Sequence, residues 1–259
     1  MSESPTAKVG LFVTCLADLF RPSVAFASIK LLEDAGCEVE VPRQQTCCGQ
    51  PGYNSGAYAD TLPLARQVIT AFADYDYLVA PSGSCVGMIR HHYPRLFEDA
   101  PEWQARAEEL AQRSWEITSF LVDVLHYQPD AAHNALQDKT LTYHDSCAGL
   151  RELGIKQQPR QLLRDTCGAT LVELEQPEVC CGFGGTFCAK MPHISEQMVN
   201  DKLDDALNSG ADLLVGGDLG CLLNISGRAS RRGQSLEVRH VTEVLADQLG
   251  DPAIGEPSS

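Results

Sequence analysis

The cysteines of this chain form a pattern that occurs twice, and this repeat limits the possible folds. A lone cysteine, a vicinal pair followed by glycine, and another lone cysteine occur in each half: Cys15, Cys47, Cys48 and Cys85, then Cys147, Cys180, Cys181 and Cys221. The lone cysteine precedes its pair by 32 residues (15 to 47) in the first half and by 33 (147 to 180) in the second. The last cysteine follows its pair by 37 (48 to 85) and by 40 (181 to 221). Such self-similarity indicates an internal duplication with two halves that fold alike.

The hydrophobic pattern around each repeat predicts alternating strands and helices. Strands are expected at 8–15, 37–42, 75–85, 140–147, 169–174 and 211–221. Helices are expected at 23–35, 57–73, 159–166 and 194–208, on apolar spacings of three and four residues. A shorter strand and helix close each half, at 116–125 and 236–249. This alternation predicts an α/β fold with two pseudo-equivalent βαβ-type lobes and mainly parallel sheets.

The repeat also predicts the domain organisation. One cysteine-rich domain is expected at residues 8–130 and a second at 138–250, with the boundary between Gln128 and Asp138. Residues 93–112 have no close counterpart in the second half, so we predict a helical insertion there. The tail at 250–259 is expected to be frayed.

The cysteines follow predicted strands, and this position predicts where they meet. Ligand sites of open parallel sheets lie beyond the carboxyl ends of the strands. We therefore expect two groups of sulfur atoms to form. The first sulfur set consists of Cys15, Cys47, Cys48 and Cys85, and the second sulfur set of Cys147, Cys180, Cys181 and Cys221.

Composition excludes several classes of function. The formal charge of −15 repels phosphate backbones, so no nucleic-acid partner is expected. No window approaches about 18 uninterrupted apolar residues, so no membrane span is expected. The first residues lack the pattern of a secretory signal, and we expect a cytoplasmic protein. Eleven cysteines in a reducing compartment indicate metal binding or thiol chemistry rather than disulfides.

Four thiolates that meet repel one another unless a metal binds them, and such a set suits Zn²⁺ or an iron–sulfur cluster. The long intervals and the glycine-rich loop at 181–185 favour a [4Fe–4S] cluster, more firmly in the second half. One or two clusters are expected, with zinc as the alternative in the first half. Redox-active vicinal dithiols are a less favoured interpretation. We interpret Cys37 and Cys167 as buried structural residues and Cys188 as incidental.

Several polar residues near the cysteines are candidates for further roles, although no catalytic residue can be assigned. His144, Asp145 and Asp218 could steer protons or accept a bond near a cluster. For Asp145 and Asp218, the alternative is a turn residue that caps the following helix. His91 and His92 lie on a predicted helix after Cys85. They could be metal ligands or surface residues. His193 begins a predicted helix and is interpreted as structural. Three basic residues could bind a carboxylate substrate, or could be ordinary surface charges: Arg90, Arg151 and Lys190.

These motifs resemble those of the CCG (cysteine-rich domain) family, which includes the cysteine-rich component of heterodisulfide reductase and the iron–sulfur component of glycolate oxidase. The fuller strings are similar to its lactate-utilisation branch over nearly the whole chain: TCCGQPGYNSG (46–56), PSGSCVGMIRHHY (81–93), HDSCAGLRELGI (144–155) and CCGFGGTFCAKMPHISEQMVNDK (180–202). The resemblance implies an iron–sulfur electron-transfer subunit of a cytoplasmic complex that oxidises L-lactate to pyruvate. It also implies iron–sulfur partner subunits, and a small 2-hydroxy acid as the substrate of the complex.

The chain departs from its heterodisulfide reductase relatives at one position in each half. Those relatives carry a fifth cysteine near the end of each motif. In this chain that position is Ser82 in the first half and Asp218 in the second. An ordinary four-thiolate cluster therefore fits better than a non-cubane one. The chain shows no nucleotide-binding or flavin motif, which favours a subunit of an oxidoreductase over a self-sufficient dehydrogenase. The alternatives are a redox component like that of heterodisulfide reductase or glycolate oxidase, and a zinc-stabilised binding protein without a redox role.

Overall fold

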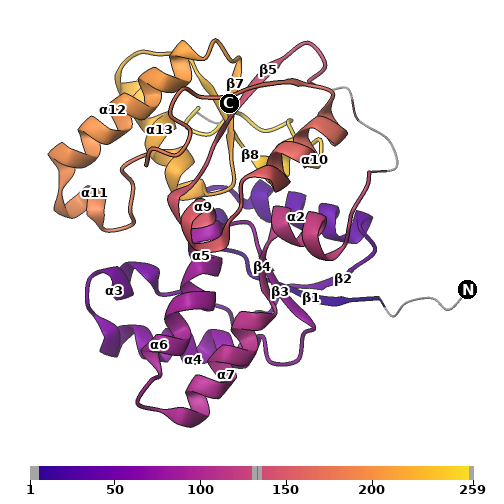
Figure 1. The fold of residues 1–259 in the computed structure, drawn as a ribbon, viewed down its shortest axis with the longest axis vertical. Coiled ribbons are helices and arrows are strands. Elements are labelled where there is room, and N and C mark those ends of the chain that lie inside the picture. The colour runs from indigo at the N-terminus through magenta and orange to yellow at the C-terminus, as the bar shows by residue number, and fades with distance from the viewer. Residues whose placement is uncertain (1–5, 130–132, 134–135, 257–259) are drawn as a thin grey trace, which may run out of the picture. The chain divides into compact units, whose positions relative to one another are not determined.

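The computed structural model describes residues 6–129, 133 and 136–256, and the chain divides into two compact units between Tyr127 and Gln128 (Figure 1). Within the described residues, each unit holds one four-stranded sheet. All neighbouring strands of both sheets are parallel. The α/β prediction with two parallel, equivalent lobes is confirmed. The predicted domain limit at residue 130 lies outside the described residues.

The two sheets share one topology. The order is β2-β1-β3-β4 in the first unit and β6-β5-β7-β8 in the second. The strands are β1 (Lys8–Leu11), β2 (Glu38–Glu40), β3 (Tyr77–Ala80), β4 (Ser114–Glu116), β5 (Thr140–His144), β6 (Thr170–Val172), β7 (Leu213–Gly216) and β8 (Glu237–His240). In equivalent registers, Val9 pairs with Val39 and Tyr77, and Leu141 pairs with Leu171 and Leu213.

Helices connect the strands and cover the sheets. The α-helices of the first unit are α1 (Cys15–Phe20), α2 (Pro22–Asp34), α3 (Gln50–Asn54), α4 (Tyr58–Ala71), α5 (Gly83–Gly87), α6 (Tyr93–Leu96), α7 (Pro101–Gln112) and α8 (Ile117–Ser119). Those of the second unit are α9 (Cys147–Leu153), α10 (Gln157–Cys167), α11 (Phe187–Lys190), α12 (Pro192–Asn208), α13 (Leu219–Arg231) and α14 (Val241–Leu245). π-helical turns follow α5 and α8, at Met88–His92 and Phe120–Val124.

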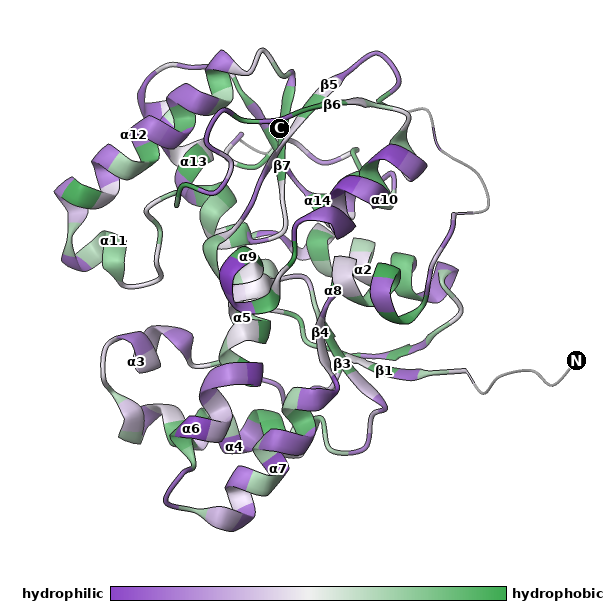
Figure 2. Ribbon diagram, in the orientation of Figure 1, coloured by the Kyte–Doolittle hydropathy of each residue, from purple (hydrophilic) through white to green (hydrophobic). Residues whose placement is uncertain are grey.

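The central strands are short apolar runs because helices cover both faces of each parallel sheet. Leu78 and Val79 of β3 are fully buried, as are Leu214 and Val215 of β7. Figure 2 shows this hydrophobic character in β7, whereas α12 alternates between hydrophilic and hydrophobic stretches. The cores therefore hold the central strands in place, and the loops at their carboxyl ends are free to vary.

Several local predictions need correction. The central strands end before the cysteines, and Cys15 and Cys147 are instead the first residues of the short helices α1 and α9. Six or seven residues carry too little hydrophobic periodicity to predict a helix. The segment 93–112 does form helices, α6 and α7, as predicted.

The tail prediction is wrong for residues 250–256, while 257–259 lie outside the described residues. Ala253 and Ile254 are buried, and the Ile254 backbone N–H donates to the Val238 carbonyl at 2.9 Å. Arg239 of β8 also donates to the Asp251 and Pro252 carbonyls, so buried side chains and hydrogen bonds together hold this segment on β8. Among the described residues, no helix is long and apolar enough to cross a membrane.

Candidate metal centres

The topology of each sheet creates a place for a ligand. The chain leaves β1 toward β2 on one side and then returns to β3 on the other side, so the strand order reverses between β1 and β3. Ligands of open α/β sheets bind beyond the carboxyl ends of the strands at such a switch point. Cys15 follows β1 and Cys85 follows β3. In the second unit, Cys147 and Cys221 follow β5 and β7 in the same way.

The structure brings the first sulfur set together. The Sγ atoms of Cys15 and Cys47 are 3.7 Å apart, and those of Cys48 and Cys85 are 3.5 Å apart. A hydrogen bond between Cys47 and Cys48 joins these two pairs. Cys48 and Cys85 are buried, whereas Cys15 and Cys47 are half-buried.

Glycine allows both cysteines of the first vicinal pair to serve one site. Gly49 has φ +83°, which turns the backbone directly after the pair. Its N–H then donates to Cys47 Sγ at 3.4 Å. From the segment after Cys85, the buried Tyr93 hydroxyl donates to the Cys48 carbonyl at 2.8 Å. The loop that carries Cys47 and Cys48 is therefore held by the Gly49 N–H and by the Tyr93 hydroxyl.

The second sulfur set repeats this arrangement. Hydrogen bonds link Cys147 to Cys180, Cys180 to Cys181, and Cys181 to Cys221. Gly182 also has φ +83°, and its N–H donates to Cys180 Sγ at 3.4 Å.

In the second unit, a side chain that follows Cys221 again holds the loop with the vicinal cysteines. The Asn224 side-chain N–H donates to the Cys181 carbonyl at 2.9 Å. A Cβ at Gly182 would lie 2.7 Å from the Ser195 carbonyl oxygen, so the loop also packs too closely on α12 for any other residue.

The cysteines that begin α1 and α9 are placed by helix caps. Thr14 accepts a hydrogen bond from the Ala17 N–H at 3.4 Å, and Ser146 accepts one from the Gly149 N–H at 3.3 Å. A hydroxyl residue directly before a cysteine was therefore a sequence signal for these two helices.

Hydrogen bonds between the thiols perturb their pKa values. Cys47 accepts from Cys15 and Cys48, and these bonds lower its pKa. The hydrogen bonds to Cys47 raise the pKa of each donor, and burial raises both further. The Cys180 pKa is lowered in the same way by its neighbours in the second sulfur set. Each set thus favours one thiolate among thiols that would release their protons to bind a metal.

His144, at the end of β5, lies against the second sulfur set. It is 1% exposed, and neither ring nitrogen has a hydrogen-bond partner among the described residues. A ring nitrogen of His144 and the Sγ atoms of Cys181 and Cys221 all lie within 4.8 Å of one another. Burial, and then the charge of Lys202, lower the His144 pKa to about 3, so the imidazole is neutral.

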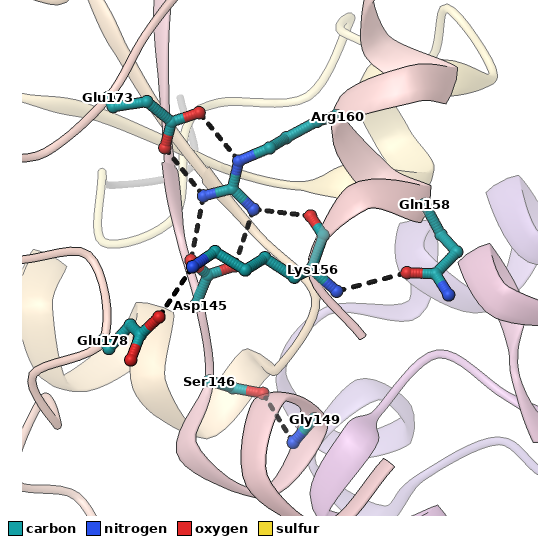
Figure 3. A network of polar contacts seen from close by, with 8 residues as sticks. All are labelled: Asp145, Ser146, Gly149, Lys156, Gln158, Arg160, Glu173 and Glu178. Atoms are coloured by element: carbon teal, nitrogen blue, oxygen red, sulfur yellow. Dashed lines mark hydrogen bonds and ion pairs between the residues drawn. The ribbon is translucent and has the colours of Figure 1, made fainter. Parts of the chain in front are cut away.

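A buried ionic network supports the segments that lead to the second sulfur set (Figure 3). Both terminal nitrogens of the Arg160 guanidinium donate to the Asp145 carboxylate at 2.8 Å. Arg160 also donates to both Glu173 oxygens at 2.8 Å. Asp145 lies just after β5 and Glu173 just after β6, so Arg160 joins the two strand ends that precede Cys147 and Cys180. The interpretation of Asp145 as a helix cap is wrong, because Ser146 caps α9.

The positions of the missing fifth cysteines are occupied differently in the two units. Ser82 caps α5 by accepting from the Cys85 N–H at 3.3 Å. Asp218 is at the N-cap of α13 without a side-chain capping bond. The Cys147 pKa is raised chiefly by its hydrogen bond to Cys180, and the Asp218 charge contributes to the same shift.

The remaining cysteines lie in other environments. Cys37 and Cys167 are buried, in agreement with a structural role. Cys167 Sγ lies 3.8 Å from His133 Nε2 and 3.9 Å from the Val244 carbonyl oxygen. Cys188 Sγ donates to the Gly185 carbonyl at 3.3 Å, within its own loop.

The other polar candidates are occupied by contacts unrelated to the sulfur sets, or lie at the surface. Arg90 stacks on Trp115, with 5.3 Å between the guanidinium carbon and the ring centroid, and Arg151 donates to the Glu178 carbonyl. His193 lies at the start of α12, as predicted, and its side chain is exposed. Lys190 is also exposed. Neither histidine after Cys85 is fully exposed: His91 and His92 are half-buried.

The donors present fit a thiophilic metal. Soft thiolates select zinc and iron–sulfur clusters, and the buried His144 imidazole is a further donor in the second unit. Sulfurs bound to one tetrahedral ion at about 2.3 Å lie about 3.8 Å apart, close to the two separations above. A four-iron cluster is larger and takes the same four donors at wider separations, which loops turned at glycine can provide.

Comparisons with known proteins gave concordant matches. The family model described as a cysteine-rich domain (CCG) matches the chain twice, over residues 9–90 and 141–226. Lactate utilization protein A from Halalkalibacterium halodurans is 51% identical over 241 residues, which cover 93% of this chain and 97% of that protein. Lactate utilization protein A from Geobacillus kaustophilus is 50% identical over 238 residues, which cover 92% of this chain and 98% of that protein.

A solved structure shares the fold of the chain. A hypothetical protein from Helicobacter pylori matches with a TM-score of 0.69 at 11% identity, over 98% of this chain and 50% of that one. This chain therefore spans half the length of that protein. At such low identity the match supports the α/β fold alone.

Proposed function

This chain belongs to the cysteine-rich (CCG) domain family, as its motifs indicated, and we propose that it is an iron–sulfur electron-transfer subunit in the oxidation of L-lactate to pyruvate. The observation that carries the proposal is the convergence of four cysteine sulfurs in each unit. Thiolates in such sets are the ligands of iron–sulfur clusters, and a bound cluster supplies one-electron redox chemistry.

The eight converging cysteines have the roles of ligands in this proposal. They are Cys15, Cys47, Cys48 and Cys85 in the first unit, and Cys147, Cys180, Cys181 and Cys221 in the second. The chain's contribution is to hold these donors, to donate backbone N–H groups to sulfur, and to bury the last two sulfurs of each set. Hydrogen bonds to sulfur and burial are the means by which a protein tunes a cluster's potential.

Lactate is proposed as the reductant because relatives about 50% identical over most of the chain are named Lactate utilization protein A. The sequence shows no nucleotide-binding or flavin motif, and the basic candidates make other contacts or lie at the surface. We therefore assign binding of the 2-hydroxy acid to the complex, with iron–sulfur partner subunits that pass electrons on. Eleven free thiols suit a reducing compartment such as the cytoplasm.

Metal and sulfide analysis of the anaerobically purified full chain tests the proposal. Iron and acid-labile sulfide in equal amounts, with an absorbance near 400 nm that bleaches on reduction, are expected. Lactate added to the chain together with its partner subunits should reduce the cluster. Reconstitution without uptake of iron and sulfide would refute the iron–sulfur role.

Two serine variants test the ligand assignment in the second unit. Cys181→Ser removes a buried sulfur of the second sulfur set and should abolish metal binding there while the first unit keeps its own. Cys167→Ser is the matched control, because Cys167 is equally buried but contacts His133 and Val244 instead. Equal loss of metal in both variants would contradict the assignment.

A zinc-stabilised binding protein is the second candidate, and the sulfur separations in the first unit favour it. Sulfurs 3.5 and 3.7 Å apart match the spacing around one tetrahedral ion. The same metal analysis decides between the two functions: one zinc ion per unit without iron supports this candidate, whereas iron with sulfide supports the redox role. A mixed result, with zinc in the first unit and iron in the second, would keep the redox role for the second unit.

A further inference from the structure

We propose that His144 is a metal ligand of the second unit, so that its site offers four sulfurs and one imidazole nitrogen, whereas the first site offers sulfur alone. This inference rests on the proposed binding of metal by the second sulfur set. It applies whether that metal is the iron of a cluster or a single zinc ion.

The position of the side chain supports a ligand. The His144 imidazole is completely buried, and both nitrogens lack a hydrogen-bond partner among the described residues. Burying a polar group without a partner is unfavourable, so such groups are rare unless something binds them. A ring nitrogen lies within 4.8 Å of the two most buried sulfurs of the set, Cys181 and Cys221. A metal held by those sulfurs would satisfy the nitrogen.

The other unit shows that the fold does not need this histidine. Three residues before Cys147 the chain has His144, and three residues before Cys15 it has Phe12. Phe12 is fully buried and packs on Phe72, with ring centroids 5.7 Å apart. An apolar ring thus completes the core at this place in the first unit, so the imidazole in the second is explained by chemistry rather than by packing.

A nitrogen donor would make the two centres unequal. In a four-iron cluster each iron takes one protein donor, so the imidazole would take the place of one of the four available thiolates. Such a replacement raises the potential of an iron–sulfur centre, because imidazole is neutral and a weaker donor than thiolate. The second centre would then have the higher potential of the two. For a single ion, the same donor would favour nitrogen-tolerant metals over purely thiophilic ones.

Anaerobic titration of the reduced full chain with Co²⁺ alone tests the inference. Cobalt reports its donors through its visible bands and needs no sulfide, so the result is independent of the iron analysis above. Wild-type protein should show two sites with different visible spectra. His144→Phe, which copies the first unit, should weaken one site roughly tenfold or more and shift its bands to match the other site. His193→Phe, at an exposed position of the same unit, should change neither.

Unchanged affinity and unchanged bands in His144→Phe would overturn the inference. Pulsed EPR of wild-type protein labelled with ¹⁵N-histidine keeps the test valid if the variant misfolds. A directly bonded nitrogen at the cobalt of the second unit, or at its reduced cluster, supports His144 as a ligand, and its absence refutes it. If the chain takes up no iron but cobalt shows a bonded nitrogen, the iron–sulfur proposal is refuted. The assignment of His144 as a metal ligand is then still supported.

Discussion

Removal of the Arg160 guanidinium is expected to destabilise the second unit strongly. The Asp145 side chain is 1% exposed and that of Arg160 is 2% exposed, whereas that of Glu173 is 47% exposed. Arg160→Met would therefore leave a buried carboxylate without its bidentate partner, while Glu173 could turn to solvent. Breaking a buried pair in this way costs about 3–5 kcal/mol.

The lower end of that range applies here, because other cations remain near Asp145. The hydrogen bond to Glu178 chiefly raises the Lys156 pKa, and the Asp145 charge adds to that shift. Burial lowers the Lys202 pKa, and the Asp145 charge opposes that shift. We expect a loss of about 3 kcal/mol in the free energy of unfolding of the second unit. A loss of that size is about a hundredfold in the unfolding equilibrium.

Amide hydrogen exchange of the reduced full chain measures this loss in each unit separately. Amides of β5 should exchange about a hundredfold faster in Arg160→Met, and those of β1 should not change. Lys30→Met is the control, because Lys30 pairs with Asp34 at the surface and such pairs contribute about 0.3–0.5 kcal/mol. The double variant Arg160→Met/Asp145→Leu should recover part of the loss, because it leaves no unpaired buried charge. An Arg160→Met effect no larger than that of Lys30→Met would refute the reasoning.

Three further predictions concern the vicinal pairs and the ionic network. Gly182→Ala should lower both the melting temperature and the metal content, because the new Cβ would lie 2.7 Å from the Ser195 carbonyl oxygen. Gly36→Ala is the control, because Gly36 has the same φ but open space around it. That control should lose only about 1–2 kcal/mol in the free energy of unfolding. Tyr93→Phe removes the hydroxyl that donates to the Cys48 carbonyl. We expect a loss of about 1–3 kcal/mol in the free energy of unfolding, measured by chemical denaturation. An unchanged free energy of unfolding would contradict this hydrogen bond. The hydrogen bond from Arg160 lowers the Glu173 pKa, so Glu173→Gln should destabilise the chain at neutral pH. The difference in melting temperature should shrink as pH falls below about 4.3, the ordinary pKa of glutamate, and vanish below the lowered pKa of the folded state. A difference that does not change with pH would contradict the ion pair.

The eight sulfur positions could be predicted because the duplication is written in the spacing of the cysteines. Strand–helix alternation predicts parallel sheets, and parallel sheets bring strand ends to one edge. The cysteines Cys15 and Cys147 were therefore placed correctly in space even though the short helices they begin were missed. Buried apolar runs predicted the central strands, but their ends depend on hydrogen bonding between strands that a single segment does not contain.

The α/β class, the duplication and the candidate sulfur ligands all follow from the order of the amino acids, because each depends on local pattern and on general rules of chain connection. Only the tertiary structure showed that His144 lies against Cys181 and Cys221 with no hydrogen-bond partner in the part of the chain that the structure describes, and that Arg160 joins Asp145 to Glu173. Burial and partnership depend on neighbours that are distant in the chain. A histidine or an arginine has the same letter in a core as on a surface, and only packing decides which contacts it makes.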